Sequence, residues 1–198
     1  PEGADLMAIV DAFVASLDHL LGAREPIDLA CFSLGAVISA HALARRGAVK
    51  RLALVGSPGT DTPRRTRAEM IRWRNADPAA QAAALRHNLL AHMMFDEAKV
   101  DALALEVYTA TVTRTRYHTR GVGSRYSLAA LLEDCTGPVL FVYGEEDVTG
   151  TPQLARDVLV GGMPQREFHI VPRSGHWVQF EAAEDVNAVL TRWFGGGA

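Results

Sequence analysis

Four short apolar runs, separated by stretches with helical spacing, constrain the fold of this sequence more than any other feature. Each run has the length of a β-strand, and helical patterns lie between and after the runs. Strands that alternate with helices favour a parallel sheet covered by helices on both faces, which is an α/β fold. The predicted strands are 26–31, 49–56, 138–144 and 165–171, and the predicted helices include 5–21, 36–46, 155–160 and 182–194.

One long segment interrupts this alternation. Residues 58–133 are rich in arginine and alanine, have a helical character and contain no apolar run of comparable quality. We interpret them as a helical cap inserted between two parts of the α/β core, residues 1–57 and 134–198. The basic cluster within this segment, 64–67, has the composition of a solvated face.

The composition narrows the class of protein. The 198 residues are 48% hydrophobic, which is enough for one compact core, and the net charge is −3 without a basic stripe. We therefore expect no nucleic acid partner, and the apolar runs are too short to cross a membrane. Cys31 and Cys135 do not suggest a disulfide framework, which favours a reducing compartment. The expected location is the cytoplasm.

A serine stands between the first predicted strand and the helix that follows it. The stretch Cys31-Phe32-Ser33-Leu34-Gly35 departs from the nucleophile-elbow pattern Gly-x-Ser-x-Gly only at its first position, where cysteine replaces glycine. A tight turn of this kind projects the serine hydroxyl clear of the sheet and requires small neighbours. The backbone N–H of Leu34 is then placed to bind an oxyanion. The alternative interpretation of Ser33 is an ordinary helix N-cap.

Two further side chains follow later predicted strands. Asp147 comes after the run 138–144, and His176 comes after the run 165–171. The carboxyl ends of parallel strands meet at one edge of a sheet. We therefore expect Ser33, Asp147 and His176 to lie together at that edge.

These three residue types together predict nucleophilic catalysis. Ser33 would attack a carbonyl group, and His176 would accept the hydroxyl proton and later return it to the leaving group. Asp147 would orient the imidazole and stabilise its charged form. Glu145 and Glu146 are the rival acids, and Asp147 is preferred because its place in the turn leaves it room to reach inward.

A metal site is not expected. The remaining histidines are not spaced as metal ligands with acidic or cysteine neighbours, and two of them, His87 and His92, are five residues apart and so do not share a helix face. The sequence therefore predicts neither a metal nor a cofactor.

The order Ser, Asp, His along the chain, together with the elbow, the cap and the final helix, resembles the α/β-hydrolase superfamily. The ending Gly175–Glu181 and the stretch His87–Asp96 are similar to capped hydrolases of meta-cleavage products, which split carbon–carbon bonds in ring-fission dienones. Those enzymes usually carry asparagine before the serine, where this chain has Phe32, and a cap arginine where it has 107–109.

The resemblance also implies three or four strands before the elbow and a loop that donates a second oxyanion N–H. Neither is visible ahead of Ser33 in these 198 residues. We expect the chain to be the C-terminal portion of a longer protein, with the N-terminal strands and the second donor upstream of residue 1.

Four apolar side chains are candidates for the substrate pocket, and the alternative is that they only pack the cap onto the core. They are Phe32, Met93, Met94 and Trp177. The expected partner is a small-molecule substrate, and a homo-oligomer is left open.

The leading functional prediction is an esterase-like serine hydrolase that acts on a small ester or related carbonyl compound through an acyl-enzyme. The alternatives are a carbon–carbon bond hydrolase of meta-cleavage-type dienones, a non-catalytic ligand-binding protein on the same fold, and acyl transfer to an acceptor other than water. A nucleophilic aspartate mechanism is disfavoured because the elbow carries Ser33.

Overall fold

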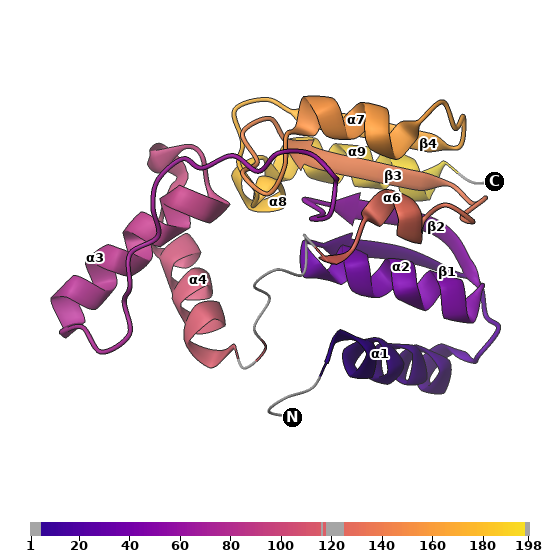
Figure 1. The fold of residues 1–198 in the computed structure, drawn as a ribbon, viewed down its shortest axis with the longest axis horizontal. Coiled ribbons are helices and arrows are strands. Elements are labelled where there is room, and N and C mark those ends of the chain that lie inside the picture. Colours follow the sequence, from indigo (N-terminus) through magenta and orange to yellow (C-terminus); the bar gives the residue numbers. More distant parts are fainter. Residues whose placement is uncertain (1–4, 116, 118–124, 197–198) are drawn as a thin grey trace.

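Four parallel strands form the centre of the molecule, and their order in space, β1-β2-β3-β4, is their order in the chain (Figure 1). The computed structural model describes residues 5–115, 117 and 125–196. All four predicted strands are present with ends shifted by at most one residue, so the predicted α/β fold is confirmed. The strands are β1 (Ile27–Phe32), β2 (Val49–Val55), β3 (Val139–Gly144) and β4 (Arg166–Val171).

Helices precede, connect and follow these strands. The boundaries of the helices agree best with the predicted ones where a capping residue or a glycine marks the helix end. At the start of the first helix, for example, the carboxylate of Asp5 accepts a hydrogen bond from the N–H of Ala8 at 2.8 Å. The α-helices are α1 (Leu6–Leu21), α2 (Leu34–Arg46), α3 (Pro78–Asn88), α4 (Ala102–Arg114), α6 (Leu128–Leu131), α7 (Pro152–Val160), α8 (Val178–Glu181) and α9 (Ala183–Gly195). The described residues also contain a π-helical turn, η1 (Leu89–Met93), and a 3-10 turn, η2 (Glu97–Lys99).

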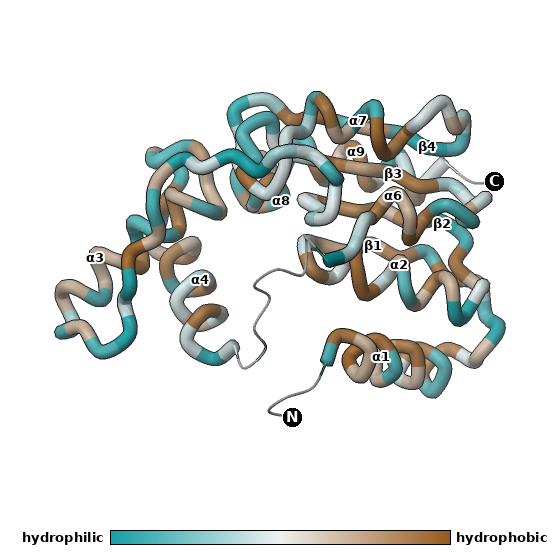
Figure 2. The backbone as a smooth tube through the Cα atoms, viewed as in Figure 1, coloured by the Kyte–Doolittle hydropathy of each residue, from teal (hydrophilic) through white to brown (hydrophobic). Residues whose placement is uncertain are grey.

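The core lies on both faces of the sheet. On one face, α2, α6 and α7 pack against the side chains of the strands, with Leu54, Phe141 and Leu159 fully buried. On the other face, Val178 and Val186 of α8 and α9 cover a second set of strand residues. The hydrophobic colour that runs along β3 reflects burial on both sides (Figure 2). This two-sided burial explains why the strands read as continuous apolar runs.

The first helix packs on α2 rather than on the sheet. Leu6 and Val10 of α1 are buried against Val37, whereas Leu20 near the end of α1 is 75% exposed. In the sheet that the structure describes, β1 is an edge strand. Among the described residues, no helix combines the length and apolarity that crossing a bilayer requires.

The segment predicted as a cap is helical only in part. Residues 57–77 contain no helix, and α3, η1 and α4 then form a separate apolar cluster beside the carboxyl ends of the strands (Figure 1). The last helix of the segment, α6, packs instead in the sheet core through Leu128 and Leu132. The predicted boundary at residue 133 therefore comes after a helix that packs with the core.

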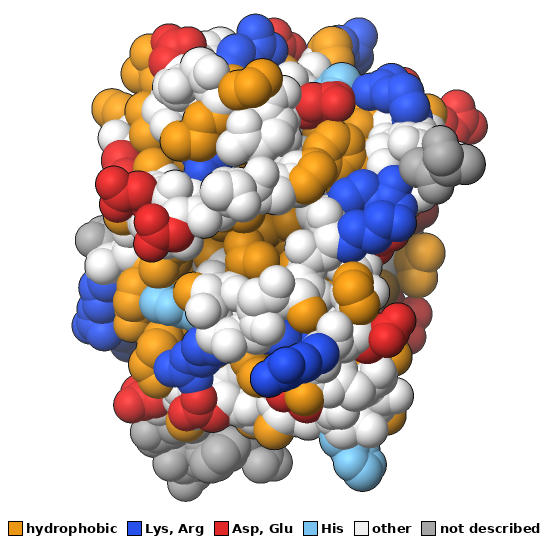
Figure 3. All heavy atoms as spheres, turned by 90° about the vertical axis from the view of Figure 1, so that its right-hand side faces the viewer, with side chains coloured by type: hydrophobic (Ala, Val, Ile, Leu, Met, Phe, Trp, Pro, Cys, Tyr) orange, Lys and Arg blue, Asp and Glu red, His pale blue; other side chains and the backbone are white. Residues whose placement is uncertain are grey.

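The opposite end of the molecule, where the strands begin, carries acidic and basic side chains interspersed over its surface (Figure 3). Neither sign dominates on this face, in keeping with a net charge of only −3.

Candidate active site

The turns that follow the strands are held by the neighbouring strand. The backbone N–H of Ser33, one residue beyond β1, donates to the carbonyl of Val55 at 3.0 Å. The N–H of Gly56, one residue beyond β2, donates to Val142 in the same way at 2.9 Å. Each turn therefore has a fixed position along the carboxyl edge of the sheet.

Ser33 occupies a strained position between β1 and α2. Its φ of 51° and ψ of −121° lie in a region that L-residues with a side chain rarely adopt, at a cost of about 1–3 kcal/mol. Its hydroxyl receives no hydrogen bond from the first turn of α2 among the described residues, so it does not act as an N-cap. A Cβ at Gly35 would lie 3.7 Å from the Cβ of Cys31. The turn thus brings these two small residues face to face.

The hydroxyl of Ser33 instead contacts His176. The Ser33 Oγ and the His176 Nε2 are 2.9 Å apart, and the His176 Nδ1 lies 2.9 Å from the Asp147 Oδ2. The structure therefore brings the three predicted residues into one continuous hydrogen-bonded line. They come from three loops, each at the carboxyl end of a different strand.

The environment of Asp147 favours its charged form. Burial alone would raise the pKa of this carboxyl, but the neighbouring His176 and the hydrogen bonds from His176 and Thr149 together lower it. Thr149 contributes both its N–H at 2.8 Å and its hydroxyl at 2.7 Å, donated to the second oxygen of Asp147. Asp147 is therefore an acceptor with both oxygens engaged.

The rival acids point elsewhere. Glu145 accepts from the N–H of Arg173 at 3.1 Å, and Glu146 pairs with Arg65 at 2.7 Å. Arg65 also donates to the carbonyl of Glu145 at 2.8 Å. The interpretation of 64–67 as a purely solvated face is therefore wrong for Arg65, which holds the loop that carries Asp147.

Leu34 is the first residue of α2, so its N–H precedes the first hydrogen bond inside the helix and has no intrahelical acceptor. The N-terminal end of the helix also carries partial positive charge. The predicted oxyanion donor thus belongs to the residue directly after Ser33, at the start of α2.

The four candidate pocket residues have different surroundings. The ring of Phe32 lies 5.0 Å from that of His176, next to the site. Trp177 stacks on Phe180 with ring centroids 5.0 Å apart, and its backbone N–H donates to the carbonyl of Met93 at 2.6 Å. Met94 is only 2% exposed and packs within the cluster of α3, η1 and α4. Contact of these side chains with a substrate stays a prediction.

His92, considered from the sequence only as a possible metal ligand, lies beside the site. The ring of His92, on η1, lies 5.7 Å from the ring of His176. Burial, followed by the charges of His176 and Arg64, lowers the pKa of His92 to about 4, so it is neutral near pH 7. π-Helical turns often mark functional sites, but this one leaves no signal in the apolar pattern.

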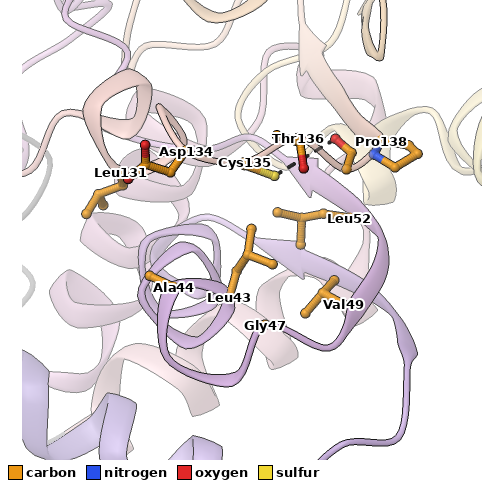
Figure 4. A pocket seen from close by; sticks show the side chains of 11 residues that line it. Leu43, Ala44, Gly47, Val49, Leu52, Leu131, Asp134, Cys135, Thr136 and Pro138 are labelled. Carbon is orange, nitrogen blue, oxygen red and sulfur yellow. Dashed lines mark hydrogen bonds between the residues drawn. The ribbon is translucent and has the colours of Figure 1, made fainter.

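A pocket of about 400 Å³ lies elsewhere, at the amino ends of β2 and β3 (Figure 4). Leu43 of α2 and Leu52 of β2 border it, with Cys135 on the far side. It is at the opposite end of the strands from Ser33. In the part of the chain that the structure describes, no three His, Cys, Asp or Glu side chains gather as a metal site would require.

Comparisons with known proteins identify the family of this chain. A family model described as the alpha/beta hydrolase family matches residues 1–189. The chain is 38% identical over 64 residues to a 2-hydroxy-6-oxononadienedioate/2-hydroxy-6-oxononatrienedioate hydrolase of Paraburkholderia phymatum, a match that spans 32% of this chain and only 22% of that relative.

Solved structures show the same fold at low identity. A bromoperoxidase of Bacillus anthracis has a TM-score of 0.75 at 15% identity and covers 98% of this chain and 75% of its own. A serine hydrolase of Cycloclasticus zankles has a TM-score of 0.71 at 19% identity and covers 96% of this chain and 71% of its own. With the family match extending over nearly all of its length, this chain belongs to the alpha/beta hydrolase family.

Proposed function

We propose that this chain carries the catalytic groups of a serine hydrolase that cleaves a small ester or related carbonyl compound. Ser33 is the nucleophile, His176 the general base and acid, and Asp147 the group that orients the imidazole. The N–H of Leu34 is one donor of the oxyanion hole.

The reaction follows from the positions of these groups. The Ser33 Oγ attacks the carbonyl carbon while its proton passes to the His176 Nε2, 2.9 Å away. The oxyanion that forms accepts the N–H of Leu34. The imidazolium, stabilised by Asp147, then gives its proton to the leaving alcohol, and the acyl group stays on Ser33. Water, deprotonated by His176, releases the acid and restores the hydroxyl.

One observation carries this proposal: the backbone of Ser33 is held at a φ of 51° while its hydroxyl contacts His176 rather than the helix. An N-cap serine requires no such strain and places its oxygen on the N–H groups of the first turn. Strain at this position is a cost that a purely structural serine would not require.

The test is labelling of the intact protein with a fluorophosphonate, followed by mapping of the modified residue. We expect the label on Ser33 and its loss in Ser33→Ala and His176→Ala. Ser16→Ala is the matched control, because Ser16 is an exposed serine of α1 whose hydroxyl bonds only to the helix. A folded protein without label would favour the non-catalytic ligand-binding alternative.

A second candidate is hydrolysis of a carbon–carbon bond in a dienone acid. It is supported by the hydrolase activity after which the Paraburkholderia phymatum relative is named, although the match to this chain covers only 64 residues. The same three residues would serve, with a resonance-stabilised carbanion leaving in place of an alkoxide and taking its proton from His176.

Two substrates separate the candidates. Turnover of a nitrophenyl ester without turnover of a yellow ring-fission dienone supports the esterase assignment. Preferred turnover of the dienone supports the second candidate, and both activities must disappear in Ser33→Ala.

A further inference from the structure

A buried carboxylate joins the loop of His176 to the helical segment. Glu181, the last residue of α8, is only 4% exposed. Its Oε1 accepts from the N–H groups of Phe95 and Asp96 at 2.7 and 2.8 Å, and its Oε2 accepts from the N–H of Gly175 at 2.5 Å. One side chain thus binds two segments of the chain, at Phe95 and at Gly175, which are 80 positions apart in the sequence.

The same two segments also touch directly. The N–H of Trp177 donates to the carbonyl of Met93 at 2.6 Å. A Cβ at Gly175 would lie 2.9 Å from both the carbonyl oxygen of Met93 and the nitrogen of Phe95. Of the two residues that flank His176, Trp177 is therefore hydrogen-bonded to the end of η1 and Gly175 packs closely against it. In Figure 1, α8 lies at the end of the sheet that faces the helical segment.

We propose that Glu181 is a positioning residue that sets the place of the His176 imidazole relative to η1, the turn that carries His92. The inference rests on the proposed function, because it assigns Glu181 a role in aligning His176 with Ser33 and Asp147.

A carboxylate is needed for this role because the three groups bound to the Glu181 side chain are all backbone N–H donors. Hydrogen bonds from N–H groups to a carboxylate are shorter and stronger than those between neutral groups. A glutamine has one carbonyl oxygen and one NH₂ group. Its NH₂ group would therefore face a backbone N–H, so that two donors would meet and one hydrogen bond would be lost. Burying the charged carboxylate of Glu181 costs free energy, because the group loses its hydration. An apolar side chain would fill the same space without this desolvation cost.

The experiment compares Glu181→Gln with the matched control Glu184→Gln, which makes the same change at an exposed position in the first turn of α9. Two quantities are measured on the intact protein, well below the melting temperature of each variant. They are the rate of fluorophosphonate labelling at Ser33 and the far-downfield proton resonance of the His176 Nδ1–H bonded to Asp147.

We expect Glu181→Gln to lower the labelling rate by about a hundredfold, the order of loss that follows a displacement of about 1 Å at a reacting group. Its downfield resonance should shift or broaden, whereas Glu184→Gln should match the wild type in both measurements. A lower melting temperature with an unchanged rate and resonance would show a purely structural role and overturn the proposal.

Gly175→Ala keeps the proposal testable if Glu181→Gln does not fold. The added Cβ wedges the same two segments apart without altering the carboxylate, and we expect the same loss of rate and the same spectral change. Wild-type labelling at Ser33 separately tests the proposed function: if it fails, the resonance still shows whether Glu181 positions His176.

Discussion

The Nδ1 of His176 lies 2.9 Å from the Oδ2 of Asp147, and both side chains are almost completely buried, at 2% and 1% exposed. A hydrogen bond shielded from water in this way fixes the imidazole tautomer that leaves Nε2 free to accept a proton. We expect Asp147→Asn to lower kcat for an ester by about ten-thousandfold, since the amide stabilises the wrong tautomer.

The matched control for this change is Glu146→Gln, which alters a neighbouring acid that pairs with Arg65. It should keep kcat within about threefold of the wild type, because a partly exposed ion pair contributes about 0–1 kcal/mol. A similar loss of kcat in both variants would mean that the conformation of the loop, and not the Asp147 carboxylate, determines the rate.

Gly144, the last residue of β3, leaves no space for a side chain. A Cβ there would overlap the carbonyl oxygens of Ser174 and Gly175, the two residues before His176. Gly144→Ala should therefore lower the free energy of unfolding by about 1–3 kcal/mol and also slow labelling of Ser33, because the loop must move. Denaturant unfolding and labelling measure the two effects. Gly195→Ala is the control, since a Cβ there meets nothing within 4 Å.

His92 makes stability depend on pH. Its pKa is about 4 in the folded protein against 6.5 for an ordinary histidine. Between these values the unfolded chain binds more protons at His92, so the free energy of unfolding falls as the pH drops from about 6.5 towards 4. Asp147, whose pKa is lowered from 3.8, contributes stability that is lost only at lower pH.

The check is urea unfolding at pH 7 and pH 5. His92→Gln should reduce the loss of stability between these conditions by about 2 kcal/mol at most. His19→Gln, at an exposed position of α1, should leave the loss unchanged. An equal loss in wild type and His92→Gln would contradict the lowered pKa.

Cys31 replaces the first glycine of the elbow and is paired with a buried hydroxyl. Its Sγ lies 2.6 Å from the Oγ of Ser39, which is 1% exposed. Cys31→Ala should lower the free energy of unfolding by about 1 kcal/mol by leaving Ser39 without this partner, while labelling of Ser33 continues. Cys31→Ser, which retains a hydrogen-bonding group, should be closer to the wild type, and the double variant with Ser39→Ala should be non-additive. Loss of labelling in Cys31→Ala would reveal a role in the turn itself.

The strands and the meeting of Ser33, Asp147 and His176 could be predicted because they depend on local patterns. An apolar run identifies each strand, and the parallel arrangement brings whatever follows the strands to one edge. Asp147 could be preferred over Glu145 and Glu146 by its place in the turn alone.

The contribution of the helical segment could not be predicted in the same way. His92 and Glu181 gain their surroundings from the way η1 rests on the loop of His176, a contact between residues far apart in sequence. Arg65 looked solvated because a run of arginines usually is, and only the folded loop supplies its partner Glu146. Residues 57–77 contain no helix, although they belong to the segment that was predicted to be helical from its composition. Composition alone therefore does not show where a helix begins.

The parallel order of the strands has a consequence for the time course of folding. The two atoms that must meet, on Ser33 and His176, belong to residues 143 positions apart, and the strands β2, β3 and β4 lie between them in the chain. Helices form within microseconds, whereas parallel strand pairing is slow because distant segments must find each other. During refolding, a sample would therefore show helical circular dichroism before it reacts with a phosphonate. Reactivity of Ser33 reports the completion of folding, and the interval between the two signals is the time that the sheet needs to assemble.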